Sequence, residues 1–148
     1  MKCSIGKLKT SSMAETLDQK QTHILTLLML AEADNKDHVN EIRFINNVAG
    51  RIGLSEMDVH EIDKHPERLT FSLPDTEADR MAVLFDLLFL MKIDGDVAEE
   101  EKELVRELGV RLGFRISMVE EFIQTMAKYV GEKVPANALL DIIRKYMN

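Results

Sequence analysis

Residues 87–114 read LLFLMKIDGDVAEEEKELVRELGVRLGF, and residues 27–54 read LLMLAEADNKDHVNEIRFINNVAGRIGL, so the two stretches align from end to end without a gap. The matched pairs are Leu27 and Leu87, Leu28 and Leu88, Leu30 and Leu90, Glu41 and Glu101, Ile45 and Val105, Val48 and Leu108, Arg51 and Arg111, Ile52 and Leu112, and Gly53 and Gly113. We call this pairing the repeat register. A repeat of this length predicts two similar structural units in one chain. Convergence of two amphipathic helix pairs is the alternative, because such pairs share their period and their caps.

The apolar residues of both stretches recur at three- and four-residue intervals, which is typical of α-helices. Ser12 and Glu15 fit a capping box at the first helix, and Ser117 fits the N-cap of a later one. Residues 66–74, which begin and end with a proline, are expected to be a linker. Pro135 is expected to start the last helix. The sequence therefore predicts an all-α fold, a bundle of about seven helices built from two pseudosymmetric repeats.

This pattern predicts one domain in a chain of 148 residues. Residues 1–12 are expected to be a flexible N-terminal segment, and residues 13–148 to form a single helical domain. The repeat halves would cover about 13–65 and 75–130, and a C-terminal helix would cover 135–147. The nine methionines are expected to fill gaps in the core.

The composition limits the classes of partner. A formal net charge of −7 repels polyanions, so we expect no nucleic-acid partner. The most apolar run, residues 82–91, is about half as long as a bilayer requires and contains Asp86, so direct membrane insertion is not expected. Cys3 is the single cysteine, and no secretion signal is recognisable. A cytoplasmic location follows as the expectation.

The acidic turns at equivalent places in the two stretches are the candidate metal site. In the second turn, Asp94, Asp96 and Glu101 have the spacing of the latter half of a calcium-binding EF-hand loop, with Gly95 at the sharp turn. Leu90 stands where the first ligand belongs, so a true EF-hand is excluded.

The first turn keeps the outer carboxylates, Asp34 and Glu41. A divalent cation such as calcium is the candidate cofactor for both turns. Helix capping alone is the alternative, because Asp96 and Glu99 also have capping spacing and acidic residues in a first turn complement the helix dipole.

The second repeat resembles the tellurite-resistance TerB-like family in the run from Leu87 through Asp94-Gly95-Asp96-Val97 and Glu101 to Leu112-Gly113-Phe114. The likeness extends over about residues 27–123. It implies a seven-helix bundle with internal pseudosymmetry and an acidic surface for divalent cations. It also implies a part in the response to tellurite or a related stress, through protein partners that include membrane-associated ones. In this chain the family's acidic residues would be Asp94, Asp96 and Glu101, with Asp34 and Glu41 as the weaker set.

Three hypotheses for function follow. The first is a small interaction module that responds to a divalent cation. The second is a metal-free helical adaptor that binds a protein partner. The third is a metal-assisted hydrolase, which needs a cleft, an open coordination position and a general base. No phosphate-binding loop or nucleophile–base pair is recognisable in the sequence, so we assign no catalytic residue and expect a protein that is not an enzyme.

Overall fold

The computed structural model describes residues 15–33, 39–93 and 95–147, which are all-helical and contain no strand. The elements are α2 (Leu17–Ala31), α3 (Val39–Ile52), α4 (Glu56–Lys64), a 3-10 turn η1 (Pro66–Arg68), α5 (Glu77–Lys92), α6 (Glu99–Arg111), α7 (Ile116–Lys128) and α8 (Ala136–Met147). The seven α-helices of this part of the chain confirm the predicted fold class. The predicted flexible segment, 1–12, lies outside the described residues.

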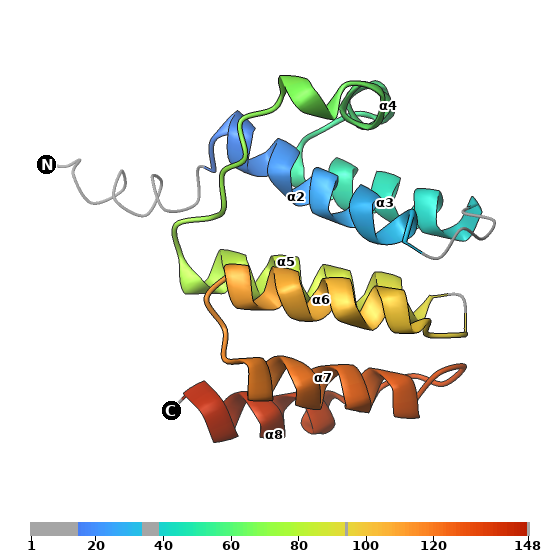
Figure 1. Ribbon diagram of the computed structural model, residues 1–148, viewed down its shortest axis with the longest axis vertical. Helices are drawn as coiled ribbons and strands as arrows, with labels where there is room; N and C mark the ends of the chain where they lie inside the picture. The colour runs from blue at the N-terminus through green and yellow to red at the C-terminus, as the bar shows by residue number, and fades with distance from the viewer. Residues whose placement is uncertain (1–14, 34–38, 94, 148) are drawn as a thin grey trace, which may run out of the picture.

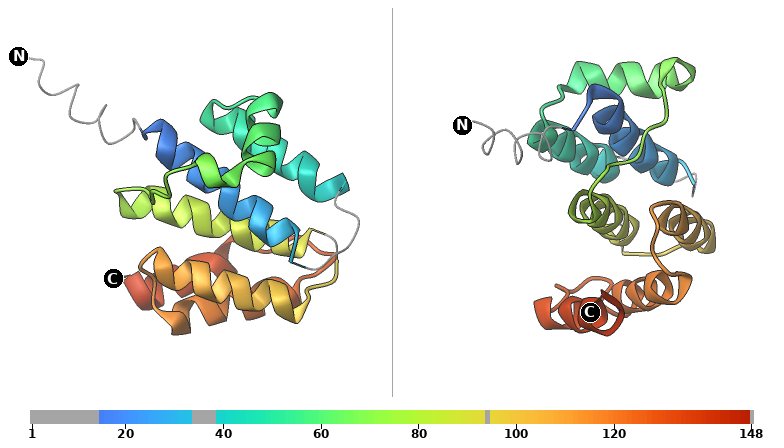
Figure 2. Two further views of the ribbon diagram at one scale, coloured as in Figure 1. Left: turned by 45° about the horizontal axis from the view of Figure 1, so that its top comes forward. Right: turned by 90° about the vertical axis from the view of Figure 1, so that its left-hand side faces the viewer.

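The helices stack in layers (Figures 1 and 2). The two middle layers are α2 with α3 and α5 with α6. Helix α4 covers the first pair, and α7 lies on the outer side of the second pair with α8 beside it. In the described ranges, no helix is long and apolar enough to cross a membrane.

The repeat register continues in three dimensions. Helices α2 and α5 are capped by Thr16 and Thr76, whose hydroxyls accept hydrogen bonds from the backbone N–H groups three residues later. The turns after α3 and α6 both contain a glycine with positive φ, Gly53 at 93° and Gly113 at 98°. In each turn the next residue donates its N–H to a carbonyl five residues earlier, which is the helix-ending bond that a left-handed glycine permits.

The contacts between the halves are reciprocal. Helix α2 packs against α5 at the centre, and α2 contacts α6 as α5 contacts α3. This exchange is the pattern of a twofold interface within one chain. The core contains the matched leucines of α2 and α5 together with Ile45, Val105 and Phe122.

The linker after α4 is fixed to α2. The Thr22 hydroxyl accepts a hydrogen bond from the Ser72 amide at 2.9 Å, and Gln19 Nε2 donates to the Leu73 carbonyl at 3.2 Å. Both polar side chains are buried. The linker is therefore held against α2 by hydrogen bonds that its own backbone groups form.

Two predicted caps differ from the structure. The helix that contains Leu17 is capped by Thr16 with Gln19, whereas Ser12 lies outside the described residues. The prediction that Ser117 is an N-cap is wrong, because α7 begins at Ile116 after Arg115. Since α4 begins after Ser55, which the repeat register pairs with Arg115, the register persists into this helix pair. The repeat register therefore places the start of α7 correctly, whereas the residue type of Ser117 does not.

Candidate functional site

The acidic turns are described only in part. Asp34 and Asp94 lie outside the described residues. Asp96 is exposed, whereas Glu41 and Glu101 are buried in the first turns of α3 and α6. Within the described ranges, no group of three or more histidine, cysteine, aspartate or glutamate side chains could hold a metal ion.

Glu101 has a structural role in the α6 turn. Its Oε1 atom accepts a hydrogen bond from the Ala98 backbone N–H at 3.0 Å. Ala98 is the N-cap of α6, so Glu101 supplies the reach-back bond of a capping box although Ala98 has no side-chain oxygen. This bond favours capping for Glu101, and coordination of a cation by both carboxylate oxygens would compete with it. The metal assignment of the five acidic residues stays a prediction.

A buried polar cluster joins the two halves, and sequence reasoning missed it. His23 of α2 lies 2.8 Å from Asp86 of α5, measured from Nε2 to Oδ2, and both side chains are buried. Arg51 Nη2 lies 2.5 Å from the same oxygen. The signal in the sequence was Asp86 itself, a charge within the most apolar run, because buried carboxylates require partners.

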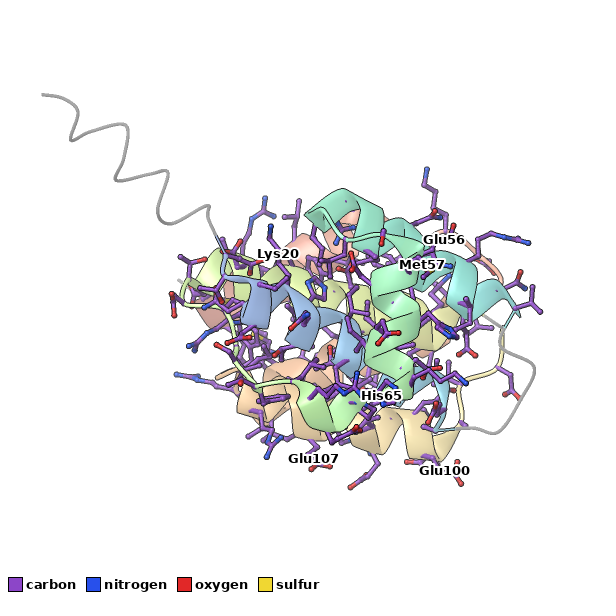
Figure 3. The ribbon with its side chains drawn as sticks, turned by 90° about the horizontal axis from the view of Figure 1, so that it is seen from above. Lys20, Glu56, Met57, His65, Glu100 and Glu107 are labelled. Atoms are coloured by element: carbon purple, nitrogen blue, oxygen red, sulfur yellow. The ribbon has the colours of Figure 1, made fainter. Side chains whose placement is uncertain are left out.

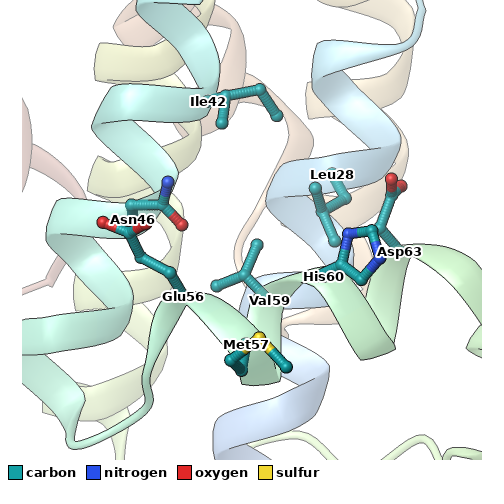
Figure 4. Close-up of a pocket in the computed structure, with 8 residues that line it drawn as sticks. All are labelled: Leu28, Ile42, Asn46, Glu56, Met57, Val59, His60 and Asp63. Carbon is teal, nitrogen blue, oxygen red and sulfur yellow. The ribbon is translucent and has the colours of Figure 1, made fainter.

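A groove of about 510 Å³ lies between α3 and α4 (Figure 4). Leu28 of α2 and Val59 of α4 are buried residues at its base. The other residues that line the groove are Ile42, Asn46, Glu56, Met57, His60 and Asp63. Ile42 and Met57 are among the exposed large apolar side chains of the protein, and Met57 is 70% exposed.

A second cavity of about 270 Å³ adjoins this groove and lies between α2 and α4. It shares Leu28 and Asp63 with the first cavity and adds Met29 and Glu32 among its lining residues. Met29 is also exposed. The expectation that the methionines fill the core is therefore wrong for Met29 and Met57, which line this surface. We call the two cavities together the α4 groove.

The equivalent place in the second half is occupied by an ion pair. Asn46 and His60 correspond to Arg106 and Glu120 in the repeat register. Arg106 Nε donates to Glu120 Oε1 at 2.6 Å, which links α6 to α7. This hydrogen bond lowers the pKa of Glu120 below its ordinary value, and the pKa of Arg106 is raised by the same bond.

A glycine also brings α6 and α7 together. A Cβ atom added at Gly109 would lie 2.8 Å from Cγ2 of Val119, which is shorter than any ordinary contact. The corresponding residue of the first half is Ala49, whose methyl group excludes so close an approach of α4 to α3. The two halves thus share a backbone plan, and these side chains account for an open groove in one and an ion pair in the other.

A third cavity, of about 470 Å³, lies beside the second acidic turn. It is lined by Phe44, Phe89, Lys92, Ile93, Gly95, Gly131 and Glu132. The Lys92 ammonium group donates to the Glu132 carbonyl at 2.6 Å, so this cavity carries a cation whose charge is partly satisfied by the chain itself.

No protein-family model, no curated protein and no solved structure matched this chain. The likeness to the TerB-like family therefore depends on the residues quoted above. Its implications for tellurite response, cation binding and a membrane-associated partner stay predictions.

Proposed function

We propose that the protein is a metal-free helical interaction module that binds a protein partner in the α4 groove. The observation that supports this function is the asymmetry between the halves. The same helix arrangement carries exposed Ile42 and Met57 around a groove in the first half, and an Arg106–Glu120 ion pair in the second. Exposed apolar side chains that gather around a concavity are characteristic of interaction sites.

The test is selection of binders followed by mutation of the groove. Helical peptides with randomised faces are displayed and selected on the wild-type protein. The Ile42→Gln/Met57→Gln variant removes two apolar anchors, and the Leu17→Gln/Val110→Gln variant makes the same change at two exposed apolar positions outside the described cavities. Selected peptides are expected to lose at least about tenfold in affinity for the groove variant, because it lacks two apolar anchors. A tenfold loss corresponds to about 1.4 kcal/mol of binding free energy. They should bind the control variant as they bind the wild type.

Equal affinities for both variants would contradict the proposal, as would a selection that enriches no helix. Circular dichroism melting of both variants checks that the fold is kept. Met57 is 70% exposed, so its substitution should alter the free energy of unfolding by less than about 0.5 kcal/mol. Ile42 is 38% exposed and buries more of its side chain, so its substitution should cost more.

The cation-responsive form of this module is tested separately, because Glu101 already accepts the Ala98 amide hydrogen bond. Calcium that binds the folded protein would raise the melting temperature in proportion to the logarithm of free ion concentration. The metal-free proposal predicts no shift at millimolar calcium, magnesium or manganese. A calcium shift that disappears in the Asp94→Asn/Glu101→Gln variant would replace it with the cation-responsive form.

A further inference from the structure

The charge around the α4 groove indicates what kind of partner it suits. Three carboxylates line it, Glu32, Glu56 and Asp63, and among its described lining residues there is no lysine or arginine. The groove therefore presents negative charge around an apolar floor.

The shape of the groove suits a helix. It follows α4, whose nine residues rise by about 13 Å. An amphipathic helix places anchors at positions i, i+3 or i+4, and i+7, which extend over about 10 Å. The apolar side chains along the groove can receive such anchors, which would come from one face of the bound helix.

The methionines of the groove fit the same kind of occupant. Met29 and Met57 lie on α2 and α4, and both are exposed. A methionine side chain is unbranched and polarisable, so it adapts to ligands of different shape. Surfaces that bind amphipathic helices use methionine for this reason.

We infer that the occupant of the α4 groove is a basic amphipathic α-helix of a protein partner, with apolar anchors on one face and lysine or arginine on its flanks. This inference rests on the proposed function and adds the chemistry of the partner. The flanking cations would lie against Glu56 and Asp63, and the formal net charge of −7 on the whole chain would accelerate their approach. An acidic helix would meet the same carboxylates as like charges, so the site also discriminates.

The experiment uses three designed helical peptides of equal length with one shared leucine face, whose flanking positions are lysine, glutamine or glutamate. Binding to the wild-type protein is measured by fluorescence anisotropy of the labelled peptide in about 50 mM salt. We expect the lysine peptide to bind about tenfold more tightly than the glutamine peptide and the glutamate peptide to bind most weakly. The difference should shrink in about 500 mM salt, because screening acts on exposed charges.

A matched pair of variants locates the effect. The Glu56→Gln/Asp63→Asn variant removes two charges at the groove, and the Glu100→Gln/Glu107→Gln variant removes two exposed charges from α6. Figure 3 shows Glu100 and Glu107 at the opposite edge from Glu56. The preference for lysine over glutamine should fall at least about threefold in the groove variant and stay unchanged in the control.

The outcomes separate the inference from the proposed function. If the three peptides bind equally and all lose affinity for the Ile42→Gln/Met57→Gln variant, the groove binds helices without regard to charge and the inference is overturned. If none binds, both the inference and the assignment of the groove are overturned. If the control variant loses the preference as much as the groove variant does, the groove carboxylates are not its source and the inference alone is overturned. A wild-type dimer in sedimentation that dissociates in the Ile42→Gln/Met57→Gln variant would make a second copy of the chain the occupant, which also overturns the inference.

Discussion

Replacement of Asp86 by alanine tests whether the buried polar cluster holds the two halves together. Asp86 of α5 accepts hydrogen bonds from His23 of α2 and Arg51 of α3, so one carboxylate contacts two of the three helices of the first half. The substitution removes the acceptor without adding volume. His23, at 4% exposure, is then left with a buried ring nitrogen that has lost this partner.

The expected cost follows from the exposure of each partner. A buried polar group that loses its hydrogen bond costs about 1–3 kcal/mol, and this term applies to His23. Arg51 retains contact with water because its side chain is 56% exposed, so its loss is at most about 1 kcal/mol. Asp86→Ala should therefore lower the free energy of unfolding by about 1–4 kcal/mol, which corresponds to roughly 2–16 °C in melting temperature.

The assay is urea denaturation followed by far-ultraviolet circular dichroism, which suits a helical chain that has no tryptophan. The double variant His23→Leu/Asp86→Ala removes both buried partners. It should lose less stability than the sum of the two single variants, because no buried polar group is left unsatisfied. Asp141→Ala is the control, since this exposed carboxylate pairs only with exposed Arg144 among the described contacts.

Two results would refute this reasoning. One is an Asp86→Ala protein within about 0.5 kcal/mol of the wild type, which is the range for ordinary surface changes. The other is additivity of the His23→Leu and Asp86→Ala effects, since coupled neighbours differ from additivity by at least about 0.5 kcal/mol. Either outcome would mean that the apolar contacts between α2 and α5 hold the halves together without this cluster.

Further predictions concern the α6–α7 contact and a helix surface. Gly109→Ala should lower the free energy of unfolding by about 1–3 kcal/mol, because the added methyl group would lie 2.8 Å from Val119. Gly50→Ala, where an added Cβ meets nothing within 4 Å, should raise it by up to about 1 kcal/mol in the same urea assay. The pKa of Glu120 is held below its ordinary value by Arg106, so this pair should stabilise the fold fully above the ordinary glutamate pKa of about 4.3 and lose that contribution as the pH falls through the lowered pKa. The difference in urea midpoint between the wild type and Arg106→Gln, worth less than about 1 kcal/mol at this partly exposed pair, should shrink over that range, and a difference that grows in acid would contradict the assignment.

The fold was predictable because its determinants are local. The helical period of the leucines and the left-handed glycines at Gly53 and Gly113 are visible in the sequence, and each specifies a nearby element. The gapless alignment of the two stretches then related the halves to each other. The helix start at Ile116 was missed because Ser117 has the residue type of a cap, although the repeat register assigns the cap to position 115.

The α4 groove could not be predicted in the same way, because it depends on pairs of residues that only packing brings together. Asn46 and His60 lie on two different helices, as do Arg106 and Glu120. Nothing in either helix alone shows that the second pair bonds and the first does not. The acidic turns were the more visible candidates because their residues are close in sequence, and capping accounts for the described hydrogen bond of Glu101.

The reciprocal contacts between α2 and α5 have a consequence for how such a protein can change. In a homodimer with this geometry, every substitution would appear in both subunits. A substitution that opened a binding groove in one subunit would therefore also remove packing contacts from the other. A covalently joined pair is released from that constraint. In the joined pair, one half can keep its close helix packing, while the other half changes the side chains that form a binding groove.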